Sequence, residues 1–186
     1  MDLLDGIGID DGTLPFRIAV LEAASGRSLG FRFDWPMVAA ESLAAELDTP
    51  ELVALASAYS DADSITIREL VMSAAASIGL RHPSPVEAIR VLGMIVSQEL
   101  LDDSITPVQA LDIVSYLTES GNLDWDLYVP YTPAYDWDEI PYLRDQRKVR
   151  REITATVKAG ARELVRRDGL SLGDTILKMT GPTLTN

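Results

Sequence analysis

The sequence predicts a mainly α-helical protein: a single-domain bundle of six or seven helices with a β-hairpin at its N-terminus. From residue 36 onward, helix-start signals that contain proline recur, and apolar residues follow them at spacings of three and four. One domain is the ordinary expectation for 186 residues, and a hydrophobic content of 47% is sufficient for a packed core.

Residues 1–35 differ from the rest of the chain, and the pattern favours a β-hairpin there. Phe31, Phe33 and Trp35 alternate with charged residues, which is the period of a strand. Residues 16–22 would form the partner strand. Their apolar positions also fit helical spacing, so the sequence leaves strand and helix open for this stretch.

Residues 36–121 are predicted to form the helical core, with helices that begin near residues 36, 50, 64, 85 and 107. Ser84-Pro85-Val86-Glu87 and Thr106-Pro107-Val108-Gln109 are capping boxes with proline in the first turn. The helix from about 85 to 101 is apolar on most sides. We therefore expect it to be the central buried helix, with Ile89, Leu92 and Val96 in the main core.

Residues 142–186 are predicted to form basic C-terminal helices, one over about 142–167 and one over 172–180. The first carries a basic stripe opposite an apolar one. The usual interpretation is a solvated face, or one that contacts the chain's own acidic surface; the functional alternative is a contact with nucleic acid, a membrane or an acidic partner. The basic residues are Arg144, Lys148, Arg151, Lys158, Arg162 and Arg166, and the apolar ones are Val149, Ile153, Val157 and Leu164.

Charge is unevenly distributed along this acidic chain. The net charge is −13; residues 1–143 carry 24 acidic and 6 basic side chains, and residues 144–186 carry 5 acidic and 10 basic ones. Such a field disfavours nucleic acid and anionic membranes and favours a basic protein partner, although solubility alone is the more usual reason for an acidic chain. The absence of cysteine, of a long apolar run and of a secretory signal favours a cytoplasmic, bacterial-type protein.

Residues 122–141 form an aromatic and acidic segment, predicted to be a loop. Asp-Trp-Asp occurs twice in it, twelve residues apart, among tyrosines and prolines. Its rings either pack onto the helices or form an exposed recognition surface, and the sequence leaves both open. We expect at least one of its two tryptophans to stay partly exposed. The candidate binding residues are Trp125, Tyr128, Tyr131, Tyr135, Trp137, Asp124, Asp126, Asp136 and Asp138.

No catalytic signature, cofactor motif or complete metal-ligand pattern is present. The single histidine, His82, precedes a proline and has no nucleophile motif beside it, so a structural role is expected. Glycine-rich phosphate loops are absent too. An enzyme would have to rely on a divalent metal held by carboxylates in residues 123–139, Glu139 included.

These observations favour an acidic helical protein-binding module over an enzyme. Capture or neutralisation of a basic protein partner, as immunity proteins and antitoxins achieve it, fits the charge, and that comparison rests on charge alone. The alternatives are an enzyme with the carboxylate metal site, and a structural subunit whose helix 142–167 docks to an acidic partner.

Overall fold

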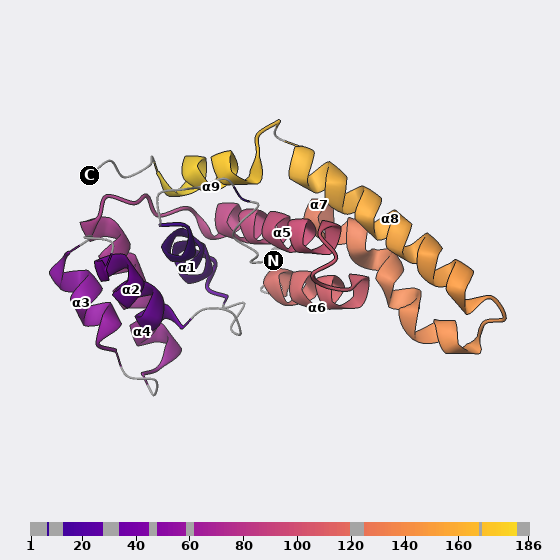
Figure 1. The fold of residues 1–186 in the computed structure, drawn as a ribbon, viewed down its shortest axis with the longest axis horizontal. Helices are drawn as coiled ribbons and strands as arrows, with labels where there is room; N and C mark the ends of the chain where they lie inside the picture. Colours follow the sequence, from indigo (N-terminus) through magenta and orange to yellow (C-terminus); the bar gives the residue numbers. More distant parts are fainter. Residues whose placement is uncertain are drawn as a thin grey trace. The chain divides into compact units, whose positions relative to one another are not determined.

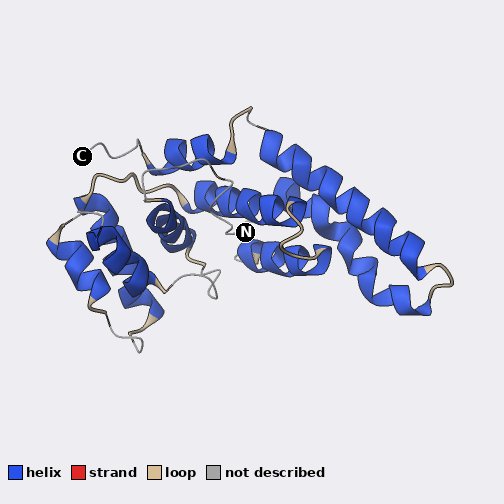
Figure 2. Cartoon of the chain, in the orientation of Figure 1, coloured by secondary structure: helices blue, strands red, loops and turns tan. Residues whose placement is uncertain are grey.

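The computed structural model describes residues 7, 13–27, 34–44, 48–58, 62–119, 125–167 and 169–181. All regular structure in these ranges is helical (Figure 1, Figure 2). The mainly helical prediction is therefore confirmed, but the predicted count of six or seven is too low, because the described ranges hold nine α-helices and one 3₁₀ helix, η1. The elements are α1 Leu14–Ser25, α2 Trp35–Ala44, α3 Pro50–Ala56, α4 Ser64–Ser77, α5 Pro85–Leu101, α6 Pro107–Thr118, α7 Trp125–Tyr128, η1 Val129–Tyr142, α8 Gln146–Arg166 and α9 Leu172–Thr180.

The chain divides into two compact units. The first comprises Met1–Ile89 and Gly173–Asn186, and the second comprises Arg90–Leu172. The first unit thus contains α1 to α4 and nearly all of α9, while α5 begins in the first unit and continues into the second. The prediction of one domain over 1–186 stays a prediction.

The predicted N-terminal hairpin is wrong, because its first arm is the helix α1. Nearly every side chain of α1 is buried, including those of Arg17 and Glu22, so no polar stripe marks the helical period in the sequence. Residues 31–33 of the second arm lie outside the described residues. Trp35, expected at the end of that strand, is the first residue of α2.

Two buried hydrogen-bond sets hold α1 in the first unit. The Arg17 guanidinium donates through Nε to Thr13 Oγ1 at 2.7 Å and through Nη1 to Thr180 Oγ1 and to the Gly181 carbonyl, both at 2.9 Å. Glu22 accepts a hydrogen bond from Trp35 Nε1 at 2.9 Å. Each polar group is thus compensated for its removal from water.

The core of the first unit lies among α1 to α4. Helix α1 packs against α2 and α4, and α3 packs against both α2 and α4. Apolar side chains from all four helices meet there, and the central ones are fully buried. This core includes Phe16, Val20, Val38, Leu52, Leu55, Val71, Ala74 and Leu80.

The predicted helix starts are confirmed by their caps. Thr106 accepts from the Gln109 backbone N–H while Gln109 Oε1 accepts from the Thr106 N–H, a complete capping box. Ser84 and Glu87 form the same reciprocal pair. Thr49 and Asp63 cap α3 and α4 through side-chain oxygens that accept from backbone N–H groups of the first turn.

The second unit is formed by the rest of α5, with α6, α7, η1 and α8. Helix α8 lies along η1, and α6 contacts η1, α7 and α8 (Figure 1). Leu92 and Val96 of α5 are 0% and 1% exposed, and Ile89 is also buried, which confirms this helix as a core element. No helix in the described ranges combines the length and the apolar character that a membrane span requires.

Helix α8 begins four residues later than predicted, since Asp145 caps it and Tyr142 belongs to η1. Arg144 therefore precedes the helix and is not part of its basic face. The opposite, apolar face is confirmed: Ile153, Val157 and Leu164 are buried, together with Ala161.

Thr106→Ala should lower the free energy of unfolding by about 1 kcal/mol, because it leaves the first turn of α6 without its cap. Chemical denaturation measures this loss. Thr156→Ala on the exposed side of α8 is the control, since it removes only a hydroxyl that bonds back to Glu152 within the helix. Equal losses in the two variants would show that capping is not the cause.

Candidate functional site in the second unit

The aromatic and acidic segment is helical in its described part. After the short α7, residues Val129–Tyr142 form the 3₁₀ helix η1 rather than the loop that the sequence suggested. A 3₁₀ helix has three residues per turn, so residues three apart lie on one face. Prolines suit such a segment, since Pro130 lies in the first turn, where no N–H is needed.

A repeat of three along the segment explains this conformation. Tyr131, Ala134 and Ile140 are buried, and Tyr128 and Trp137, in the same register, are half-buried. The five positions thus form one inward face. This period of three is present in the sequence. A search for the period of two of a strand or the period of 3.6 of an α-helix does not detect it.

The inward face is anchored by a buried pair of hydroxyl groups. Tyr131 is 0% exposed, and its hydroxyl lies 2.6 Å from the Ser97 hydroxyl of α5. Because Ser97 donates its own proton to the Gly93 carbonyl at 2.7 Å, Tyr131 is the donor in this pair. Burial raises the pKa of Tyr131 to about 12, partly opposed by the Ser97 hydroxyl.

Two glycines let neighbouring helices approach α7 and η1 closely. A Cβ atom at Gly160 of α8 would lie 2.5 Å from Pro130 Cβ and 3.2 Å from its Cα. A Cβ atom at Gly93 of α5 would overlap the Leu127 side chain. Arg167, the residue that follows α8, forms an ion pair with Asp126 at 3.0 Å.

The outward faces of η1 present aromatic rings and carboxylates. Tyr135 is 57% exposed and Tyr142 is 87% exposed. The Tyr135 ring meets Tyr128 edge to face with centroids 6.3 Å apart, and their hydroxyls are hydrogen-bonded, which raises the pKa of Tyr128. Trp137 is partly exposed, as expected for at least one tryptophan, and the Arg150 guanidinium lies 5.1 Å from its ring centre.

The predicted site residues thus separate into different roles. Tyr131 is a core residue and Asp126 is engaged with Arg167, whereas Tyr135, Asp136 and Asp138 face solvent. Asp124 lies outside the described residues, as does the side chain of Trp125. Residues that the prediction did not include are also exposed here: Val129, Tyr142 and Leu143, with Glu139 beside the aspartates.

The described ranges hold no cluster of side chains suited to bind a metal ion, and the single histidine makes a structural contact. No group of three or more histidine, aspartate or glutamate side chains there is placed to hold a metal ion. His82 lies in an exposed turn of the first unit, and its Nε2 is 2.9 Å from the Met72 carbonyl oxygen. That contact ties the turn to α4, which is a structural role.

Comparison with known proteins gives no relative: no family model, curated protein or solved structure matches the chain.

Gly160→Ala should destabilise the protein by about 1–3 kcal/mol, because the added methyl group overlaps Pro130. At an open helix site the same change would stabilise the protein by up to about 1 kcal/mol through helix propensity. The sign of the change in the free energy of unfolding therefore distinguishes a close contact from open space. In a Pro130→Gly background, which removes the opposing Cβ, the loss should shrink. A gain of stability in the original background would contradict the close approach.

Tyr131 should make the folded state sensitive to alkali. Its pKa is about 12 when folded and near 10 when unfolded, so the unfolded chain loses this proton first and stability falls as pH rises from 10 toward 12. Tyr131 lowers the free energy of unfolding by at most about 1.4 kcal/mol for each pH unit in this range. Denaturation at several pH values should show a shallower decline for Tyr131→Phe, while Tyr142→Phe at an exposed ring keeps the original slope.

Proposed function

We propose that this chain is a protein-binding module whose contact surface is the outward side of η1. The observation that carries the proposal is the division of one short helix into a buried face and an exposed one. Tyr131 and Ile140 fix the segment, while Tyr135 and Tyr142 project from it into solvent. Exposed aromatic rings on a fixed backbone are typical anchors of protein interfaces.

A fixed segment binds at a lower entropic cost than a free loop. The residues of η1 are already helical, so ordering them does not oppose association. Tyrosine has few rotatable bonds, and each ring offers both apolar area and a hydroxyl. We therefore assign the main anchoring roles to Tyr135 and Tyr142, since one side of Trp137 is already occupied by Arg150.

The charge of this surface favours a basic partner. Asp136, Asp138 and Glu139 are exposed beside the anchor rings, and the whole chain carries a net charge of −13. Such a field accelerates encounter with a basic protein surface and disfavours acidic competitors. The carboxylates then act as a polar rim around the aromatic anchors.

Neutralising the rim should slow capture of the partner without unfolding the chain. In Asp136→Asn/Asp138→Asn/Glu139→Gln, the association rate at low salt should fall about tenfold, and its salt dependence should weaken. The partner is first obtained by affinity purification from the native cells with quantitative mass spectrometry. Rates are then measured with the purified pair.

The charge-matched control is Glu41→Gln/Asp48→Asn/Glu69→Gln, three exposed carboxylates of the first unit. It has the same net charge and should keep most of the association rate. Tyr142→Ala should leave stability within about 0.5 kcal/mol and weaken binding by about 2 kcal/mol. If rim, control and Tyr142 variants all bind like the original chain, the outward side of η1 is not the interface.

A further inference from the structure

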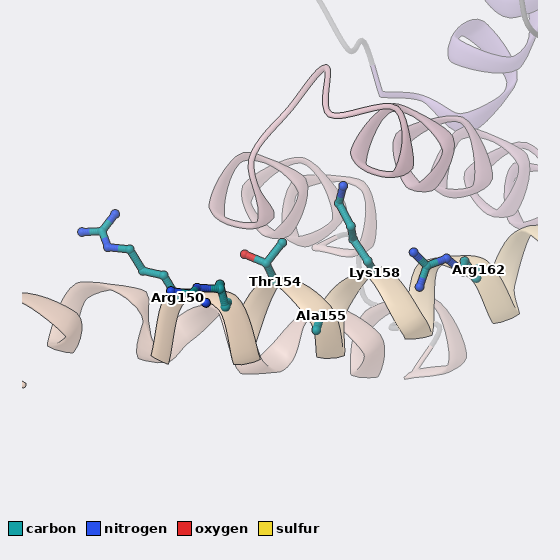
Figure 3. A pocket seen from close by; sticks show the side chains of 6 residues that line it. Arg150, Thr154, Ala155, Lys158 and Arg162 are labelled. Carbon is teal, nitrogen blue, oxygen red and sulfur yellow. The ribbon is translucent and has the colours of Figure 1, made fainter. Parts of the chain in front are cut away.

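A second surface of the same unit has the opposite charge. One side of α8 forms a shallow groove of about 410 Å³, and Figure 3 shows its side chains along the helix. No acidic side chain lines it. The lining residues are Arg150, Arg151, Thr154, Ala155, Lys158 and Arg162.

The four cations differ in how firmly they are held. Arg150 lies over the Trp137 ring, and Lys158, whose side chain is 15% exposed, forms an ion pair with Asp103 from the turn after α5. Arg151 and Arg162 are exposed and form no ion pair with any other described residue. The groove therefore contains two cations that are already engaged and two guanidinium groups that keep all their donors for a ligand.

The shape of the groove suits a chain segment rather than a single ion. From Arg150 to Arg162 the helix rises ~18 Å. Between the cations lie Thr154 and Ala155, whose small side chains let a second backbone come close. A segment of about six extended residues, or about three turns of helix, matches this length.

The charge around the groove favours a short acidic ligand over a nucleic acid. The basic side of α8 continues past the groove, with the exposed Lys148 and Arg166. Arg150 contacts Trp137, however, and the two aspartates that flank Trp137 are exposed. The affinity of a nucleic acid depends on many phosphate contacts, and the net charge of −13 opposes them. A short run of carboxylates needs only the cations of the groove.

We propose that this groove on α8 binds a short acidic segment of a partner protein, with Arg151 and Arg162 forming forked hydrogen bonds to its carboxylates. The site is separate from the outward side of η1 and of opposite charge. A partner that used both surfaces would carry an acidic run, which faces the groove, beside a basic patch, which faces the outward side of η1. Forked arginine–carboxylate pairs fix such an orientation as well as adding affinity.

The test uses the full chain and a defined probe. A fluorescein-labelled peptide of roughly a dozen residues, half of them glutamate, matches the helical span of the groove. Fluorescence anisotropy should show saturable binding that weakens with salt. Arg151→Glu/Arg162→Glu should weaken it at least about tenfold, as expected when two charge-assisted contacts are reversed.

The matched control is Arg144→Glu/Lys178→Glu, which has the same change of net charge at two exposed positions outside the groove. It should bind the peptide within about twofold of the original chain, since screening confines surface charges to short range at physiological salt. Equal losses in both double variants, or no saturable binding by the original chain, would overturn the proposal.

A single-stranded oligonucleotide of the same charge as the peptide tests the competing class of ligand. It should bind more weakly than the peptide. Tighter binding that Arg151→Glu/Arg162→Glu abolishes would make the groove a nucleic-acid surface and would also overturn the proposal. These outcomes are independent of the η1 variants, so the groove and the proposed function can fail separately.

Discussion

The exposed surface of η1 depends on the buried hydroxyl pair of Tyr131 and Ser97. A large ring brought fully inside the unit needs a partner for its hydroxyl, and α5 supplies one at 2.6 Å. Once Tyr131 is placed, the period of three places Ala134 and Ile140 inside and turns Tyr135, Asp136 and Asp138 outward. The proposed recognition surface is thus a consequence of core packing and needs no contribution from the exposed residues themselves.

Helix α8 has two faces with different tasks. Its buried residues, Ile153, Val157, Ala161 and Leu164, pack inside the unit, and Gly160 permits the contact with Pro130. The opposite side keeps most of its positive charge for solvent or a ligand. Because the same helix is part of the support for η1 and forms the groove, the two surfaces are held in a fixed relation. If both proposals hold, a partner would be recognised by the order of its charges as well as by their sign.

Local signals predicted the parts of the fold where a few neighbouring residues decide the structure. The caps at Ser84 and Thr106, the burial of Leu92 and the two-faced pattern of α8 all follow from spacings of three or four residues. For helix α1 the local spacing left strand and helix open. Arg17 is buried with a hydrogen bond to Thr180, which lies far away in the sequence, and no local rule anticipates that partner.

The conformation of the candidate segment could not be predicted from its composition. Clustered aromatic and acidic residues drew attention to the segment, but composition alone did not separate core rings such as Tyr131 from exposed rings such as Tyr135. Pairings across the unit decide that difference. Arg150 over Trp137 and Arg167 with Asp126 join residues that are 13 and 41 positions apart, beyond the reach of any local pattern.

The 3₁₀ form of η1 also restricts how this chain can change in length. Each residue of such a helix turns the backbone by ~120° and advances it by ~2.0 Å, so the 14 residues of η1 extend ~28 Å, close to the ~31 Å of the 21-residue α8. Loss or gain of one residue between Tyr131 and Ile140 would rotate every later side chain by a third of a turn. One aspartate would then point inward, Asp138 after a loss or Asp136 after a gain, and the core residues beyond the change would point outward. The outward positions of η1 can therefore accept substitutions, but the number of residues in η1 is fixed by its packing against the neighbouring helices.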